Sequence, residues 1–403
     1  MAEEPLQASL EGNVKVFIAR ALLSGIYQQI LWVIYQPFIL SLNPSMMVLG
    51  LLQGLGGYQG LLNALVNPLF GWISDRVKRK PFIILGSLLM MIAVLFLFLS
   101  SLTHIFGFVI PAVILIGVSF LDIPIIDSLV AESVKPAQRG RAYSQITLAM
   151  MAPGIFAPFV GGLIADIFGF PIIFGVGIVI LCLITRLLIR YLNEIPRPAR
   201  TINFSGLYSL MKRNLSPPKT LRNVYVMHML DAFVAGLGPM LIIGILRAHF
   251  NFSGFQLGII SAFQSAITTL TQIFIGRMIE QYGCKKVIFG SYLAFTIYLA
   301  GMALTKNFIS ILLVQIFMGI AIATWHSPLQ TLMANSTTPM GRAEAMGRIS
   351  LYRGMFGFVA PFLGGFLYEQ YGYSAPLWAS FIGGIAVTTF VHFYIRVEND
   401  KLI

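Results

Sequence analysis

Acidic and histidine residues lie inside long apolar stretches of this chain, where an ionisable side chain is costly and is therefore a functional candidate. They include Asp122, Asp127, His228 and Asp231. Burial disfavours the charged form of a carboxylate, so such a group can take a proton on one side of a membrane and release it on the other. His228 and Asp231 are three residues apart and can touch on one helix face. These four residues are the candidates for proton coupling, and Asp122 is the first choice.

Counting residues from the predicted ends of the apolar stretches places four ionisable groups at one depth, roughly 12 Å in at ~1.5 Å per residue. They are Arg20, Asp127, Asp231 and Arg353. Two are cationic and two anionic, so they can neutralise each other, either as structural ion pairs or on a transport path. We expect Arg20 and Asp231 to face each other across a cavity. Asp122 lies five residues deeper, and no cationic residue shares its predicted depth, so we expect its carboxylate to be unpaired.

Polar and aromatic residues on several apolar stretches indicate a binding cavity. The candidate lining residues are Arg20, Tyr27, Gln28, Gln59, Asn63, Gln264, Trp325, His326, Gln330 and Arg353. Aromatic rings beside a few polar groups suit the binding of a small organic molecule. Hydrogen bonding between helices by Gln and Asn is the alternative, and it is common in membrane bundles.

The composition requires lipid as the solvent of these helices. Of the 403 residues, 57% are hydrophobic and 10% are charged, against roughly 25% charged in soluble proteins. We predict an all-α integral membrane protein with twelve spans of about the ~20 residues that a bilayer requires. The predicted spans are residues 14–42, 46–73, 81–100, 105–132, 142–165, 171–192, 224–250, 254–279, 287–305, 308–335, 345–368 and 375–396.

Basic residues fall in alternate loops between these spans. They are Arg76, Lys78, Arg79, Lys80, Lys135, Arg139, Arg141, Lys285, Lys286 and Arg342, whereas the other loops hold only Arg247 and Lys306. The positive-inside rule therefore places the basic loops and both termini in the cytoplasm of an inner-membrane protein. The net charge of +12 then reflects topology, and we expect no nucleic-acid partner. The basic, proline-containing residues 193–222 are predicted to be a cytoplasmic linker between a bundle at 1–192 and a bundle at 223–403.

Two loops repeat a pattern of a glycine, three residues, an acid and a basic cluster. The first is residues 71–80, with five charges in six residues, and the second is residues 276–286. A charged loop that occurs once in each half suggests a transporter of two homologous halves. The pattern resembles the loop between the second and third helices of Major Facilitator Superfamily transporters. Lys78 stands where that family has a glycine, but the second copy keeps it at Gly283.

Further repeats extend the resemblance over nearly the whole chain. Residues 136–142 match residues 339–345, and residues 157–162 match residues 360–365, both at an offset of 203. The second pair reads Ala-Pro-x-x-Gly-Gly, which resembles the Gly-Pro-x-x-Gly-Gly motif of the family's antiporters with Ala157 in the first position. The glycines allow close helix approach, and the proline weakens the backbone hydrogen bonds.

This resemblance implies two six-helix bundles that rock about a central cavity, and it implies a loop that acts as a conformational latch. In the family, the acid at Asp75 approaches the start of the eleventh helix when the cytoplasmic side closes. The residues assigned to the latch are Gly71, Asp75, Arg76, Arg79, Lys80, Gly276 and Glu280. Gly71 is expected to allow close packing beneath the loop.

The resemblance favours a proton-coupled antiporter that exports a drug or metabolite. Exporters of this family usually carry an arginine in the first half of the fourth helix, and residues 111–118 have none. A proton-coupled importer of a sugar or organic acid and a lipid or amphiphile flippase therefore stay open. A non-transporting receptor is disfavoured, because both charged loops are retained. The expected partners are a small organic solute, protons and the lipid bilayer.

The sequence carries no signature of an enzyme. A phosphate-binding loop, a metalloprotease helix and a cofactor fingerprint are all missing from it, and its acids and histidines have no metal-ligand spacing. We therefore expect a monomeric carrier without metal or cofactor.

Overall fold

The computed structural model describes residues 3–57, 60–74, 76–134, 139–194, 221–336, 342–398 and 401–402. The N-terminal half comprises α1 (Glu3–Ser41), α2 (Met46–Gly56), α3 (Leu61–Ser74), α4 (Lys80–Thr103), η1 (Phe106–Phe108), α5 (Val109–Ser119), η2 (Phe120–Asp122), α6 (Ile123–Ser133), α7 (Arg139–Met151), η4 (Ala152–Ile155), α8 (Ala157–Phe168) and α9 (Phe170–Tyr191). Here η marks a short 3₁₀ helix.

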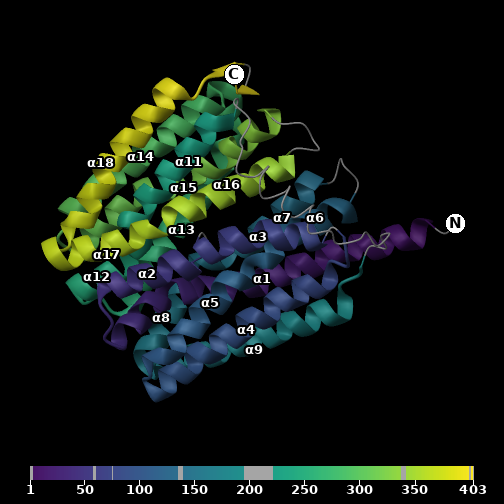
Figure 1. Cartoon of the computed structure of the whole chain (residues 1–403), viewed down its shortest axis with the longest axis horizontal. Helices are drawn as coiled ribbons and strands as arrows, with labels where there is room; N and C mark the ends of the chain where they lie inside the picture. The colour runs from purple at the N-terminus through teal and green to yellow at the C-terminus, as the bar shows by residue number, and fades with distance from the viewer. Residues whose placement is uncertain are drawn as a thin grey trace.

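The C-terminal half repeats this arrangement of helices. It comprises α11 (Arg222–Leu237), η6 (Pro239–Leu241), α12 (Ile242–Phe250), α13 (Gly254–Tyr282), α14 (Cys284–Leu304), α15 (Phe308–Ser336), α16 (Arg342–Gly357), α17 (Val359–Tyr371) and α18 (Ser374–Tyr394). A two-residue antiparallel pair, β1 (Val397–Glu398) and β2 (Lys401–Leu402), follows. The two halves lie side by side, the first running from purple to teal and the second from green to yellow (Figure 1).

Ten of the twelve predicted spans are long and apolar enough to cross a membrane when broken helices are counted as one. Eight are single spans, and the other two are the bent pairs formed by α7 with α8 and by α11 with α12, at 42° and 41°. The remaining two predicted spans are occupied by α2 with α3 and by α16 with α17, each a pair of shorter helices.

The breaks have local causes in the sequence. Pro124 lies in the first turn of α6, and Pro239 and Pro153 lie in the 3₁₀ turns η6 and η4. Proline lacks the backbone N–H that continues a helix and crowds the preceding turn. The break at η2 places Asp122, the first candidate for proton coupling, in a 3₁₀ turn in the middle of a predicted span.

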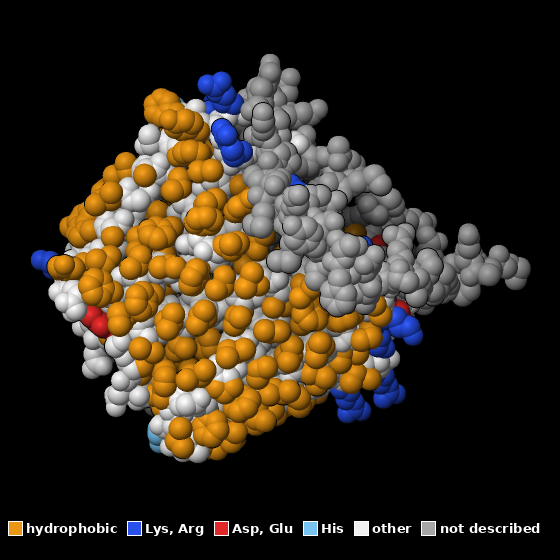
Figure 2. All heavy atoms as spheres, viewed as in Figure 1, with side chains coloured by type: hydrophobic (Ala, Val, Ile, Leu, Met, Phe, Trp, Pro, Cys, Tyr) orange, Lys and Arg blue, Asp and Glu red, His pale blue; other side chains and the backbone are white. Residues whose placement is uncertain are grey.

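The outer surface of the helices is apolar. Figure 2 shows hydrophobic side chains over most of the visible face, with lysine and arginine at its margins. On α9, for example, Val179 is 60% exposed and Ile189 is 55% exposed. A water-soluble protein rarely exposes so large a continuous apolar surface, whereas a bilayer solvates it.

Glycines bring the two halves into backbone contact at one end of the molecule. A Cβ added at Gly162 on α8 would lie 2.0 Å from the carbonyl oxygen of Gly254 at the start of α13. In the matching place on α17, a Cβ at Gly365 would lie 2.4 Å from the carbonyl oxygen of Met46 at the start of α2. The repeated Gly-Gly motif therefore allows the close helix approach expected from the sequence. We call this end the glycine end and the end that carries Arg79, Lys80 and Lys285 the basic end.

Candidate functional site

An ion pair lies in the interior of the N-terminal half. Arg20 of α1 donates from Nη2 to Oδ2 of Asp122 in η2 at 2.5 Å. The Asp122 side chain is 5% exposed and that of Arg20 is 20% exposed. Gly86 of α4 makes room for this arrangement, because a Cβ there would lie 2.9 Å from the Cβ of Asp122.

The expectation that Asp122 has no cationic partner was wrong. The depth had been counted along straight helices, but the tighter η2 turn separates α5 from α6. An arginine side chain is also long enough to reach a carboxylate on a neighbouring helix.

A small cavity adjoins the ion pair of Arg20 and Asp122. It has a volume of about 30 Å³ and is lined in part by Ser24, Tyr27, Gln28 and Ser119, and that volume accommodates a water molecule.

A second ion pair lies inside the C-terminal half. Arg353 of α16 donates from Nη1 to Oδ2 of Asp231 on α11, and the same Nη1 lies 3.3 Å from Nδ1 of His228. The Arg353 guanidinium carbon is 5.0 Å from the centre of the Trp325 ring, and the His228 ring packs edge-on to that ring at 5.7 Å. Trp325 in turn donates from Nε1 to the Tyr292 hydroxyl at 3.0 Å. The helices α11, α14, α15 and α16 are thus joined by one polar and aromatic cluster.

The predicted contact between Arg20 and Asp231 was also wrong. Each half neutralises its own charges, Arg20 with Asp122 and Arg353 with Asp231. The physical reason is that a buried charge needs a partner close by, and for Arg20 and Asp231 that partner lies on a neighbouring helix of the same half. Of the predicted depth layer, Arg353 and Asp231 pair with each other, whereas Arg20 pairs with the deeper Asp122. Asp127, the fourth member, forms no ion pair among the described residues.

His228 has a polar atom that is buried without a hydrogen-bond partner. The residue is 0% exposed, and its Nε2 has no partner among the described residues. Because Arg353 can only donate, Nδ1 of a neutral His228 is the acceptor and Nε2 carries the proton, by assignment from the hydrogen-bond network. This leaves a buried N–H donor in the cluster that no described residue satisfies.

Asp127, the third candidate carboxylate, has a different environment. It is exposed, and its backbone carbonyl accepts from the Tyr143 hydroxyl at 2.5 Å. It lies on α6, five residues beyond Asp122. Among the parts of the chain that the structure describes, no ion pair to its carboxylate is present, so it is accessible where Asp122 is enclosed.

The remaining cavity candidates are dispersed over both halves. Gln28 donates to the Tyr27 hydroxyl at 3.3 Å, and Asn67 donates to the Asn63 side chain at 2.6 Å. Gln264 is half-buried, and its carbonyl accepts from Thr268. Gln330 is exposed. Gln59 and the side chain of His326 lie outside the described residues.

The charged loop of the N-terminal half is tied to its own half. Arg79 donates to Glu132 at 2.8 Å, and the backbone N–H groups of Arg79 and Lys80 donate to Glu194 at 3.1 and 2.8 Å. Lys80 Nζ also donates to the carbonyls at the end of α9. The Arg76 guanidinium stacks 3.8 Å above the Trp72 ring. These contacts fix the start of α4 against α6 and α9.

The remaining latch candidates are Gly71, Asp75, Gly276 and Glu280. Asp75 lies outside the described residues, so its contact with the eleventh helix stays a prediction. A Cβ added at Gly71 or Gly276 would meet no described atom within 4 Å. The close packing expected beneath the loop at Gly71 stays a prediction for the state in which the cytoplasmic side is closed. Glu280 is exposed.

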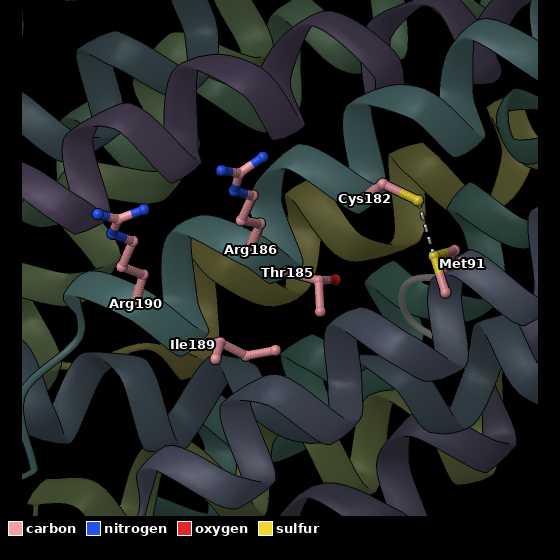
Figure 3. Close-up of a pocket in the computed structure, with 6 residues that line it drawn as sticks. All are labelled: Met91, Cys182, Thr185, Arg186, Ile189 and Arg190. Carbon is pink, nitrogen blue, oxygen red and sulfur yellow. Dashed lines mark hydrogen bonds between the residues drawn. The ribbon is translucent and has the colours of Figure 1, made fainter.

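A shallow groove on the outside of the molecule lies between α4 and α9. It is lined by Met91, Cys182, Thr185, Arg186, Ile189 and Arg190. Figure 3 shows the Arg186 and Arg190 side chains leaving α9 on the side away from Ile189 and Met91. The groove faces outward from the N-terminal half, so it is not part of the path between the two halves.

Sequence reasoning missed three residues that the structure makes prominent. Tyr292 completes the cluster around Trp325. Asp166 and Glu369 each bind the start of a helix in the other half. A signal for these two was present, because they are the same distance beyond the repeated Ala-Pro-x-x-Gly-Gly motif.

Two repeated halves of membrane-length helices, with broken helices and buried charges facing the interior, define a membrane transporter. Residues 18–236 and 223–402 match the family model of the Major Facilitator Superfamily, and the chain belongs to this family. Its fold is therefore twelve helices in two six-helix bundles, and it is not an enzyme.

Relatives of the chain carry different solutes. It is 21% identical over 345 residues to the "Multidrug resistance protein MdtG" of Salmonella arizonae, a match that covers 85% of this chain and 84% of the relative. It is 23% identical over 192 residues to the "Cis,cis-muconate transport protein" of Acinetobacter baylyi, covering 47% and 46%. The crystal structure of the human organic anion transporter MFSD10 (TETRAN) superposes with a TM-score of 0.71 at 15% identity, covering 95% of this chain and 99% of that one.

Proposed function

We propose that the chain is a secondary active transporter that moves a small organic solute by alternating access and couples this movement to protons. The observation that carries the proposal is the Arg20–Asp122 pair beside a cavity of about 30 Å³. A proton delivered through water in this cavity to Asp122 would remove the negative charge and release Arg20. The charge state of the N-terminal half would then differ between the loaded and unloaded carrier.

The residues around the pair supply the other parts of this mechanism. Asp127 is exposed, so it can exchange protons with solvent before they reach the enclosed Asp122. In the other half, the Nε2–H of His228 has no acceptor among the described residues and lies beside the Trp325 ring, which suits a solute with an acceptor group and an apolar body. Proton coupling thus belongs to the first half, and solute recognition involves both.

Export of a drug or metabolite in exchange for protons is the leading assignment. It is supported by the likeness to a multidrug resistance protein and by the Ala-Pro-x-x-Gly-Gly motif. We also propose that the basic end is cytoplasmic, that residues 193–222 link the two bundles, and that the carrier is a monomer of the inner membrane. Asp75 remains our candidate for a latch at the basic end.

Uptake of an organic acid together with protons is the second candidate. The cations of the two interior ion pairs, Arg20 and Arg353, are guanidinium groups, which bind carboxylates with two parallel hydrogen bonds. If a proton neutralises Asp122, Arg20 loses its counter-ion, and a substrate carboxylate can replace it. A proton and an organic anion would then move in the same direction.

Proteoliposomes with an entrapped pH indicator distinguish the two candidates. Muconate and the lipophilic cation tetraphenylphosphonium are added outside in turn, without an imposed gradient. Acidification of the lumen with muconate supports symport, and alkalinisation of the lumen with the cation supports antiport. Asp122→Asn should abolish the pH change in either case, whereas Lys306→Gln, at the far end of the molecule, should not. A pH change in Asp122→Asn equal to that of the wild type would refute the role of Asp122.

A further inference from the structure

Two acidic residues occupy equivalent places at the glycine end of the two halves. Asp166 lies near the end of α8, and Glu369 lies near the end of α17. Their numbers differ by 203, the offset of the repeated Ala-Pro-x-x-Gly-Gly motif on these helices. They are also the only acidic residues of the sequence in the predicted loops and helix ends on this side of the protein.

Asp166 caps a helix that belongs to the other half. Its Oδ1 accepts from the backbone N–H of Gly254, and its Oδ2 accepts from the backbone N–H of Phe255, both at 2.8 Å. These are the first two residues of α13. The next donor, the N–H of Gln256, is taken by the side chain of Ser253 in the helix's own capping box. The start of α13 is therefore completed by a carboxylate from α8.

Glu369 makes the corresponding contact with the roles of the two halves exchanged. Its Oε1 accepts from the N–H of Met47, the second residue of α2, at 2.8 Å. Here, too, a local serine covers the third position, since Ser45 Oγ accepts from the N–H of Val48 at 3.2 Å. Each helix start thus has one cap from its own chain segment and one carboxylate from the opposite half.

The positive end of a helix attracts a carboxylate, and the first four N–H groups of a helix have no partner within it. Both contacts depend on the close approach of the two halves at the glycines. Asp166 is one turn beyond Gly162, which meets Gly254, and Glu369 is one turn beyond Gly365, which meets Met46. If the halves separated at this end, both carboxylates would lose their helix starts together.

A neutral contact closes the same end nearer the centre. Gln36 of α1 is 2% exposed. It donates to the carbonyl of Met240 at 2.7 Å and accepts from the N–H of Gly244 at 2.6 Å, both in the other half. The glycine end thus holds one neutral and two charged sets of contacts between the halves.

We propose that Asp166 and Glu369 are a pair of latches that hold the glycine end closed, and that opening this end requires both carboxylates to release the helix starts of the opposite half. The latches presuppose the alternating access of the proposed function, but not the identity of the solute or proton coupling. Both side chains are exposed, so each contact is weak enough to break in every transport cycle.

The expected shift in the open–closed equilibrium follows from the exposure of the two carboxylates. A carboxylate at an exposed helix start shifts an equilibrium by about two- to fivefold. Removing both contacts should therefore shift the ratio of open to closed glycine ends by about four- to twenty-fivefold, since the two sites are independent. Asp166 binds two N–H groups and Glu369 binds one, so Asp166→Asn should have the larger single effect.

Pulsed electron paramagnetic resonance on the purified, solute-free protein tests this proposal. Spin labels at Thr103→Cys and Leu304→Cys, in a background of Cys182→Ser and Cys284→Ser, report the distance between the halves at the glycine end. Asp166→Asn with Glu369→Gln should move the population to longer distances. Lys306→Gln is the matched control, because it changes a charge at the same end and Lys306 forms no hydrogen bond or ion pair with the other half among the described residues.

Charge-retaining variants separate the latch from a fold defect. Asp166→Glu and Glu369→Asp should keep distance distributions closer to the wild type than the neutral variants do. If the double neutral variant does not fold, the two single variants decide the question. Wild-type distance distributions in both singles, or an equal shift in Lys306→Gln, would overturn the proposal. Because no solute or pH gradient is used, failure here leaves the proton-coupling hypothesis unaffected.

Discussion

Replacing Arg353 tests whether the buried cluster of the C-terminal half is held by its ion pair. The side chains of Arg353 and Asp231 are 9% and 10% exposed. Arg353→Gln would therefore leave a carboxylate that is largely removed from water and has lost its counter-ion. Breaking a buried pair from one side costs about 3–5 kcal/mol. Asp231→Asn should cost a similar amount, because it leaves the guanidinium between His228 and Trp325.

The double variant supplies the decisive comparison. Asp231→Asn with Arg353→Gln leaves no net charge, and the two amide side chains can hydrogen-bond to each other. We expect it to be more stable than the sum of the single effects predicts, with a coupling free energy of about 2–3 kcal/mol. Unfolding by sodium dodecyl sulfate in mild detergent, followed by circular dichroism, gives the relative free energies.

A control variant fixes the scale of this measurement. Glu280 is exposed near the end of α13, and Glu280→Gln should stay within about 0.5 kcal/mol of the wild type. If the two single costs simply add in the double variant, Arg353 and Asp231 do not stabilise each other, and the ion pair does not hold the cluster together.

Three further predictions concern the two ends of the molecule. Arg79→Gln should lower the free energy of unfolding by about 1–3 kcal/mol, because Arg79 is 3% exposed and pairs with Glu132. Thermal melting in detergent measures this loss of stability, and an unchanged melting temperature would contradict the prediction. Gly162→Val should prevent the close approach of α8 to Gly254, because even a Cβ at residue 162 would lie 2.0 Å from the Gly254 carbonyl oxygen. The distances between spin labels at Thr103 and Leu304 should therefore lengthen, or the protein should fail to assemble. Wild-type distances would rule this prediction out. Asp75→Asn should insert normally, but cysteines in the cavity should be labelled from the basic end about two- to fivefold faster. Unchanged labelling would show that Asp75 does not act as a latch at that end.

Local features of the sequence accounted for the arrangement of the helices. Apolar runs of membrane length, interrupted by basic loops, predicted the spans, and a repeat offset of 203 predicted two similar halves. Glycines at 161–162 and 364–365 predicted a close approach without indicating its partner. Such properties depend on the local solvent and on backbone sterics, which a few neighbouring residues determine.

The partners of the charged residues could not be predicted in the same way. The sequence indicated no partner for Asp122, which pairs with Arg20, and it indicated Arg20 for Asp231, which pairs with Arg353. Counting along straight helices ignores the η2 break and the reach of an arginine side chain, and it contains no information on helix rotation. A rotation of one residue turns a side chain by about 100°, which is enough to move it from one neighbour to another.

The sequence by itself determined that the chain is a two-part helical membrane protein, because hydrophobicity and repeats are properties of the chain. Only the tertiary structure decided which charges meet. It enclosed Asp122 with Arg20, placed His228 beside Arg353, and carried Asp166 and Glu369 to the starts of α13 and α2. These contacts join residues that are 88 to 322 positions apart in sequence, and their energies depend on distance and burial, which exist only once the helices have packed.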